Sequence, residues 1–457
     1  MRYLIVLLIL TPGVLLAPRQ DDDALQDFIE SNHKFTSAVY KHCNFSFQFE
    51  GLVKEKVGNV IVSPFSTETI LALAYEGAKG QTASELLSGL YLPDAEELHA
   101  AFKSLTQQFQ VSGDDLKLLS ANKIYVAQDV EIEENFKDIA VSVYTADVDN
   151  VDFSKPGIAS EINGWVEENT NNKIQDLIDP NSIGPNTRMV LINTLYFYGK
   201  WESMFEKTGT VARVFYRSKN ETVDIDTMTQ TGFLKYSESA DLDAKFLELP
   251  YQDGNISMII ALPNNIEGLA DLEDRLEEVL EINQFWNEYL EVTMPKFVTV
   301  SEIDFVPILK NIKYGLKDFP LGIQRVFEDN ADLTGFSSKA NDLYISGVTQ
   351  KAYINITEGG TEAAGGSDIV TENVHSFLRS QMTEEKLAIR VFLRHYWKKG
   401  LSARAAAKVI CEVEGVIPEP LPGPPGPDPV PFHIDHPFLY VIRKSGVIPF
   451  IGRYTGP

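Results

Sequence analysis

Asp435 and His436 are the neighbouring residues whose types come closest to a catalytic pair. A carboxylate that orients an imidazole supplies two members of the triad that activates a serine nucleophile. The sequence, however, contains none of the motifs G-x-S-x-G, H-E-x-x-H, G-x-x-x-x-G-K-[ST] or G-x-G-x-x-G. The pair also precedes the run Pro437-Phe438-Leu439-Tyr440, which is typical of the start of a strand. We therefore predict no catalytic residue and no enzyme.

Metal and cofactor sites also lack their usual ligands. The two cysteines, Cys43 and Cys411, can form one disulfide at most, which excludes a disulfide framework and a cysteine-rich zinc site. The seven histidines are scattered along the chain. No metal and no cofactor is predicted.

Residues 361–372 show a different chemistry, because charged and uncharged side chains alternate there. The inward set would be small or uncharged: Thr361, Ala363, Gly365, Ser367, Ile369 and Thr371. The other set holds every charge: Glu362, Ala364, Gly366, Asp368, Val370 and Glu372. A strand that enters the middle of a sheet needs free N–H groups, no proline and an uncharged inward face. Since no proline lies between Lys351 and Arg379, we predict that this segment can become a new strand, whereas a one-residue slip would bury carboxylates at several kcal/mol each.

Composition sets the class of protein around this segment. The chain has 457 residues, of which 44% are hydrophobic and 23% charged, as in ordinary globular proteins. The 65 acidic and 40 basic residues give a net charge of −25. This charge opposes binding to nucleic acid or to an anionic membrane, so neither is an expected partner.

The first 17 residues are typical of a secretory signal peptide. Arg2 is followed by the apolar runs 3–10 and 14–17, which end in the small residue Ala17. The stretch is too short, and interrupted by Pro12, to span a membrane. We therefore predict a secreted, extracellular protein. N-x-S/T sequons predict glycosylation at Asn44, Asn220 and Asn255, whereas a fourth, at Asn355, lies in a strand-like run and is expected to stay unmodified.

Up to residue 374 the pattern is that of one mixed helix-and-strand domain. Residues 59–63 read as a short buried strand, and a helix capped at Ser66 or Thr67 is expected to run to Gly77. Residues 189–198 and 257–262 are strand-like. We thus expect a main domain over 18–374 and its last strands over 432–457.

Between these parts lies a segment of different composition, residues 375–431. Residues 379–408 carry eight basic and two acidic side chains, a local charge of +6. The patterns of 383–399 and 402–411 predict two helices, and the proline-rich run 418–431 is expected to be extended and unpaired. We interpret this segment as an insert.

Several segments, in order along the chain, resemble the serpin family of protease inhibitors. They are 59–66 (Asn-Val-Ile-Val-Ser-Pro-Phe-Ser), 71–82, 193–201 (Asn-Thr-Leu-Tyr-Phe-Tyr-Gly-Lys-Trp), 294–296 (Met-Pro-Lys), 331–335 (Ala-Asp-Leu-Thr-Gly), 432–442 and 450–453. The resemblance covers 28–374 and 432–457 and implies an α+β fold with three β-sheets, about nine helices and an exposed reactive-centre loop between Gly360 and Phe432. It also implies a monomeric suicide substrate that traps an extracellular serine protease when the loop inserts into the large sheet.

The resemblance further implies roles for single residues. Glu358 would pair with Lys296 where the loop joins the sheet, near Trp201. A gate at the centre of the sheet would consist of Ser63, Ser66, Asn193 and Gln350, with glutamine where the family often has histidine. The hinge would comprise Glu358, Gly360, Thr361, Glu362, Ala363, Ala364, Gly365, Gly366 and Ser367.

Counting along this hinge places the scissile bond at Val374-His375, which suits an elastase-like protease. The alternative is Arg379-Ser380, which suits a trypsin-like protease but leaves five residues of slack. From Thr361 to Val374 an extended chain would span about 46 Å at roughly 3.3 Å per residue.

The insert departs from the family pattern. Residues 392–415 resemble the first helices of a mariner-type transposase DNA-binding domain, but prolines replace the recognition helix, so DNA binding is not expected. The insert is either an exonised transposon fragment, a misjoined gene model or a genuine basic exosite. A non-inhibitory serpin, a carrier or a plain protease substrate, is therefore the alternative function.

Overall fold

The computed structural model describes residues 20–49, 58–185, 187, 189–252, 254–310, 321–328, 330–337, 343–345, 347–363 and 428–457. The chain divides into two compact units, Met1–Gly365 with Pro429–Pro457, and Gly366–Asp428. The expected signal peptide, both candidate scissile bonds, Cys411 and the two helices expected in the insert lie outside the described residues. So do Ala364, Gly365, Gly366 and Ser367 of the expected hinge.

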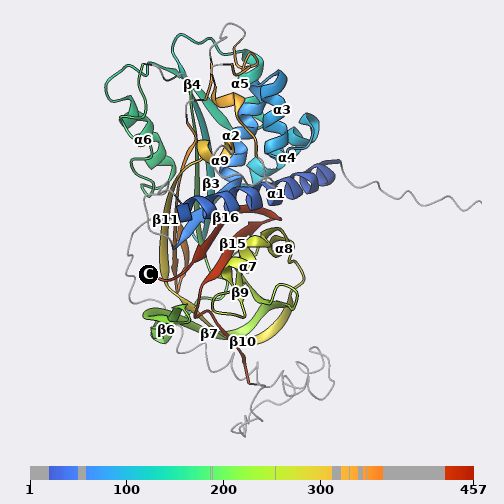
Figure 1. Cartoon of the computed structure of the whole chain (residues 1–457), viewed down its shortest axis with the longest axis vertical. Helices are drawn as coiled ribbons and strands as arrows, with labels where there is room; N and C mark the ends of the chain where they lie inside the picture. The colour runs from blue at the N-terminus through green and yellow to red at the C-terminus, as the bar shows by residue number, and fades with distance from the viewer. Residues whose placement is uncertain are drawn as a thin grey trace, which may run out of the picture. The chain divides into compact units, whose positions relative to one another are not determined.

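A seven-stranded sheet forms the centre of the first unit (Figure 1). Its strands run in the order β11 (Phe297–Asp304), β12 (Thr349–Thr357), β13 (Gly360–Ala363), β5 (Met189–Lys200), β3 (Leu116–Ala127) and β2 (Gln110–Ser112), and β4 (Ala146–Val151) pairs in parallel with β3. The strand expected at 189–198 is thus present as β5. It pairs with β3 from Leu116↔Gly199 to Val126↔Met189, a register that makes these two strands the longest ladder of this sheet.

The second sheet has nine strands. Their order is β1 (Val60–Val62), β16 (Val447–Tyr454), β15 (Phe438–Lys444), β9 (Ile256–Pro263), β8 (Ala244–Pro250), β7 (Glu221–Ser239), β10 (Trp286–Pro295) and β14 (Val430–His433), and β6 (Val211–Ser218) pairs with β7. β7 has 19 residues and pairs in turn with β6, β10 and β8. β7 runs through both halves of this nine-stranded sheet and joins them by hydrogen bonds. The part of the chain that the structure describes therefore contains two sheets, where three were expected.

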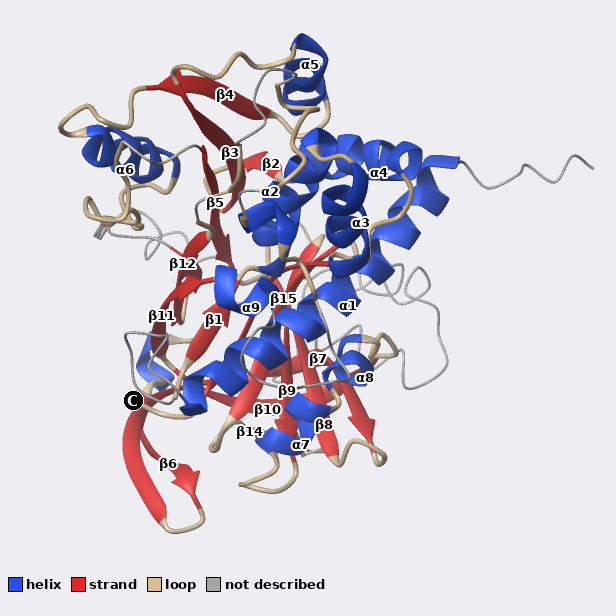
Figure 2. Ribbon diagram, turned by 45° about the horizontal axis from the view of Figure 1, so that its top comes forward, coloured by secondary structure: helices blue, strands red, loops and turns tan. Residues whose placement is uncertain are grey.

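Nine α-helices lie in the described residues, which confirms the α+β class and the expected number. They are α1 (Gln20–Phe49), α2 (Pro64–Gly77), α3 (Gly80–Gly89), α4 (Ala95–Gln108), α5 (Glu134–Ser142), α6 (Ile158–Asn169), α7 (Leu269–Asp274), α8 (Leu276–Leu280) and α9 (Val306–Lys310). Figure 2 shows α6 on one face of the seven-stranded sheet and α2, α3 and α4 on the other. None of the described helices is long and apolar enough to cross a membrane.

α2 begins at Pro64, and its N-cap is Ser63 rather than the expected Ser66 or Thr67. Proline is tolerated in the first turn of a helix because its missing N–H would have no partner within the helix. Nearly every side chain of α2 is buried. A helix that is buried all round must lie inside the protein, and α2 packs against α1, β16 and β5.

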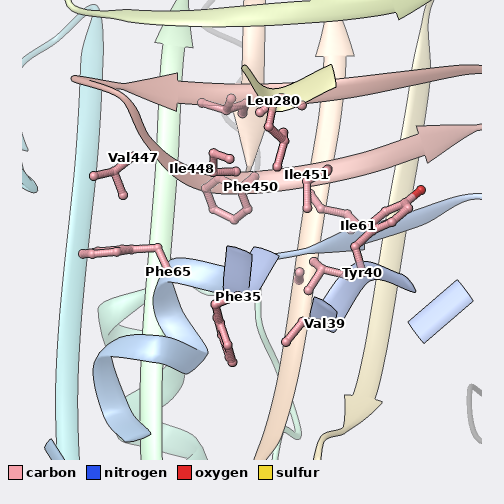
Figure 3. Close-up of a cluster of buried hydrophobic side chains, with 14 of the residues drawn as sticks. Phe35, Val39, Tyr40, Ile61, Phe65, Leu280, Val447, Ile448, Phe450 and Ile451 are labelled. Atoms are coloured by element: carbon pink, nitrogen blue, oxygen red, sulfur yellow. The ribbon is translucent and has the colours of Figure 1, made fainter. Parts of the chain in front are cut away.

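Two separate hydrophobic clusters hold the unit together. The larger one includes Phe35 and Tyr40 of α1, Phe65 of α2 and Phe450 of β16, which pack together in Figure 3. The smaller one lies between α6 and the seven-stranded sheet: Tyr125, Ala127, Phe153, Ile158, Ala159, Ile162, Val166, Ile174, Leu177, Ile178, Val190 and Ile192. α6 is therefore attached to the sheet by a cluster of its own.

The end of the proline-rich run differs from the expectation. Val430 and Pro431 were expected to be unpaired, but they belong to β14, in register with Leu290 and Glu291 of β10. β14 is the last strand in the order of the nine-stranded sheet. An edge strand can accept proline because one of its sides needs no N–H.

Candidate functional site: the hinge and the gate of the seven-stranded sheet

The chain leaves β12 at Thr357, turns through Glu358 and Gly359, and re-enters the sheet as β13. Glu358 is buried, and its Oε1 atom lies 3.1 Å from Lys296 Nζ and 2.7 Å from Thr210 Oγ1, which donates to it. Burial alone would raise the pKa of Glu358, but the hydrogen bond from Thr210 and the ion pair with Lys296 hold this pKa below its ordinary value. The turn is thus anchored by a charged carboxylate.

Trp201 holds the same turn through its backbone and its ring. The indole Nε1 donates to the Thr357 carbonyl oxygen at 3.0 Å, and the backbone N–H donates to the Gly359 carbonyl at 3.1 Å. Phe205 N donates to the carbonyl of Glu358 at 3.0 Å. The structure therefore brings Lys296, Trp201 and Glu358 together, although no motif predicted the contribution of Thr210.

β13 differs from the expectation of an exposed loop that begins at Gly360. Its four residues already lie between β12 and β5, with Thr361 opposite Ile356 on one side and Gly199 on the other. Thr361 is 1% exposed. No ladder among the described residues joins β5 directly to β12, so β13 is the described strand that connects the two halves of the sheet.

The start of α2 contacts both halves of this sheet below β13. On the β12 side, Gln350 donates from Nε2 to the Ser63 carbonyl at 2.8 Å and to Thr67 Oγ1 at 3.1 Å, and Ser63 N donates to Gln350 Oε1 at 2.8 Å. Ser63 Oγ donates in addition to the Pro449 carbonyl at 2.7 Å. Glutamine thus both donates and accepts, as its amide allows.

On the β5 side, Ser66 Oγ donates to Asn193 Oδ1. Asn193 Nδ2 in turn donates to Asn122 Oδ1 at 2.5 Å and to Ser120 Oγ at 3.4 Å on β3. Gln350 and Asn193 therefore bind the same helix start from opposite sides. The contributions of Thr67 and Asn122 to the gate are not predicted from the sequence. Thr67 directly follows the recognised segment 59–66, whereas nothing in the local sequence marks Asn122.

Directly after Thr67 on α2, Glu68 is fully buried. Asn32 Nδ2 donates to Glu68 Oε2 at 2.8 Å, and Ser31 Oγ donates to Oε1 at 3.3 Å. Burial raises the pKa of Glu68 to about 8, although both hydrogen bonds act in the opposite direction. A carboxyl group that changes charge near neutral pH thus lies beside the start of α2.

The remaining candidate residues are spread over the surface or serve the fold. Asn220 and Asn255 are exposed in turns, Asn44 lies in α1, and Asn355 lies in β12. His436 is buried, with Nδ1 2.7 Å from Asp435 Oδ1 and Nε2 2.7 Å from the Pro263 carbonyl. Its second nitrogen therefore faces a backbone carbonyl rather than a nucleophile, and β15 starts at Phe438 as expected.

The fold and this site define an α+β protein that holds the first residues of a long C-terminal loop as a strand of its own large sheet. The family model described as "Serpin (serine protease inhibitor)" matches residues 31–457. Antitrypsin from Bombyx mori is 32% identical over 428 residues, which cover 92% of this chain and 94% of that protein. Antichymotrypsin-2 from the same organism is 35% identical over 341 residues, or 72% and 88% of the two chains.

The solved structure of Serpin48, described as a highly specific serpin in the insect Tenebrio molitor, is similar at a TM-score of 0.72 and 34% identity. The match covers 94% of this chain and 98% of that one. The chain belongs to the serpin family. The relatives and the family description support protease inhibition, rather than an enzymatic activity, as its general function.

Proposed function

We propose that this chain is a secreted inhibitor of an extracellular serine protease and acts as a monomeric suicide substrate. The observation that carries the proposal is β13, because four residues of the loop already occupy a strand position between β12 and β5. The alternating pattern of 361–372 continues beyond them with an uncharged face. The rest of the segment can therefore follow β13 into the sheet without burying a charge.

In the proposed reaction the protease serine attacks the carbonyl carbon of Val374. The Val374–His375 peptide bond breaks, the amine leaves with His375, and residue 374 remains bound to the serine as an ester. The freed strand then inserts behind β13, and its roughly 46 Å reach carries the acylated protease along the sheet. Cleavage at Arg379-Ser380 would follow the same chemistry and would select a trypsin-like protease.

The gate residues are proposed to control this insertion. An inserting strand has to pass between β12 and β5 next to Gln350 and Asn193. The contacts of these two side chains with the start of α2 must therefore let β12 and β5 separate. Since the two side chains bind the same helix start from opposite sides, their contacts together restrain the distance between β12 and β5, and at least one contact must lengthen or break as a strand passes. Ser63 and Ser66 would then act as a fixed point for the two halves.

A carrier or plain substrate is the second candidate function. The observation that favours it is the length of the loop, because Glu358 and Asp435 lie 77 positions apart in the sequence. Extra loop length costs little closure entropy. With Val374 as the bait residue, the insert leaves with the His375 fragment. Cleavage inside the insert, as at Arg379-Ser380, would add slack between the inserted strand and a bound protease, and slack lessens the distortion imposed on that protease.

The test is incubation of the full chain with pancreatic elastase and with trypsin, in separate reactions. We expect a complex that survives denaturing electrophoresis, and a released fragment that starts at His375 with elastase. A fragment that starts at Ser380 would move the specificity to trypsin-like proteases. Cleavage by both proteases without a complex would overturn inhibition and favour the plain substrate.

A further inference from the structure

Tyr251 lies against Thr361, the second residue of β13. Its hydroxyl oxygen is 2.5 Å from Thr361 Oγ1. The tyrosine ring stacks on Trp201 at a centroid distance of 4.6 Å and meets Phe197 edge-on at 4.9 Å. With a ring on each side, the hydroxyl is held in one place.

Both hydroxyl groups are buried, with Tyr251 at 0% and Thr361 at 1% exposure. Among the described residues, each is the hydrogen-bond partner of the other. Burial raises the pKa of Tyr251 above its usual value, so the phenol stays neutral and can donate or accept. A buried hydroxyl that loses its partner costs much more than the net value of one hydrogen bond, so this pair discriminates strongly between residue types at position 361.

A steric restraint lies one residue before it. A methyl group on Gly360 would come within 2.1 Å of the Gly199 carbonyl oxygen, and one on Gly199 within 2.7 Å of the Tyr251 ring. If the strand shifted by one residue, so that Thr361 took the place of Gly360, its Cβ would enter this closed space. The shift is therefore blocked on one side by the backbone, while the tyrosine hydroxyl favours the observed register.

We propose that Tyr251 is the positioning residue that accepts a hydroxyl side chain at position 361 and so fixes the register in which the loop enters the sheet. Its importance for trapping a protease rests on the proposed function; the docking of β13 does not. In the observed register Glu362 lies opposite Tyr198 and Asn355, and the alternation in the sequence places the uncharged residues of 361–372 in the same set as Thr361. A hydroxyl residue at position 361 is thus a requirement set by the sheet, in addition to small size.

Hydrogen exchange of the full chain, without any protease, tests the docking. We expect Tyr251→Phe and Thr361→Val each to lower the protection of the amides of 360–363 by about ten-fold or more, because each leaves one buried hydroxyl unpaired. The double variant should return to within about three-fold of the wild type, since no unpaired hydroxyl remains. Thr361→Ser, which keeps the hydroxyl, should also stay within about three-fold.

Tyr440→Phe is the matched control, because Tyr440 is equally buried and its hydroxyl donates to the Val60 carbonyl at 3.1 Å, on another sheet. It should leave the protection of 360–363 unchanged. Should Tyr251→Phe fail to fold, Thr361→Val still decides, as it changes only the loop. Two results would overturn the proposal. One is unchanged protection in Thr361→Val, and the other is a loss of protection in the double variant as large as the losses of the two single variants combined.

The same variants separate this inference from the proposed function. If the chain inhibits a protease, the single variants should raise the number of inhibitor molecules consumed per complex, and the double variant should restore it. A chain that forms no complex but shows the expected exchange pattern would refute inhibition and keep the role of Tyr251. A chain that forms complexes equally well in all variants, with unchanged exchange, would refute the role of Tyr251 alone.

Discussion

Glu68 should make the stability of this protein fall as the pH rises. Its pKa is about 8 in the folded chain against an ordinary value of 4.5. Between these values the folded state binds a proton that the unfolded state has lost, so the contribution is complete below pH 4.5 and is lost as the pH rises through 8. Each pKa unit corresponds to about 1.4 kcal/mol, so the loss approaches about 5 kcal/mol as an upper estimate.

The perturbation that isolates this effect is Glu68→Gln. The amide keeps the shape but cannot ionise. Its oxygen can accept the hydrogen bond from Asn32, and its NH2 group can donate to Ser31 Oγ, whose hydroxyl also donates to the Leu90 carbonyl. We expect the variant and the wild type to have similar thermal midpoints at pH 5, and the variant to be the more stable of the two at pH 8.5. Because burial is the main cause of the raised pKa, added salt should change this difference little.

The assay is thermal unfolding at one scan rate at pH 5, 6, 7, 8 and 8.5. Glu96→Gln is the matched control, since Glu96 is exposed on α4, and it should follow the wild type at every pH. If Glu68→Gln lost stability in parallel with the wild type between pH 5 and 8.5, the pH dependence would have another source and the reasoning would be refuted.

Four further predictions follow from the site. Gln350→Leu should cost about 1–3 kcal/mol, because it leaves the buried Ser63 N–H without its acceptor; urea unfolding measures it, and no loss would contradict the gate. Gly360→Ala should expel β13, seen as faster exchange of its amides, since its Cβ would lie 2.1 Å from a carbonyl oxygen. Thr361→Arg should turn an inhibitor into a substrate on denaturing gels; complexes formed as before would disprove insertion. Asn255→Gln should remove one glycan by mass spectrometry, and an unchanged mass would show that this exposed sequon is unused.

Local sequence patterns predicted the elements that have a strong hydrophobic periodicity or a clear boundary residue such as proline. The strand and helix around Pro64, the strand that contains Asn193 and the strand that starts at Phe438 are all present. The N-cap of α2 is Ser63 rather than Ser66 or Thr67, since proline in a first turn is compatible with either side of a helix boundary. Patterns of this kind act over a few neighbouring residues, and there they are informative.

The contacts that make the site depend on residues far apart in the chain. Thr210 lies 148 positions from Glu358, and Tyr251 lies 110 positions from Thr361. No spacing rule connects such pairs, because they meet only after two sheets have formed. The same holds for β13: alternation in 361–372 predicted that this segment can enter a sheet, but not that Thr361, Glu362 and Ala363 are already there.

The separate hydrophobic cluster under α6 has a consequence for how the fold opens. A helix joined to the sheet mainly by its own cluster can form a cooperative unit that unfolds while the larger core stays intact. We expect the amides of 158–178 to exchange with a lower opening free energy than those of α2. Heating would then produce a partly open species with a bared face of the sheet before global unfolding, and at high concentration its exposed apolar side chains would favour self-association.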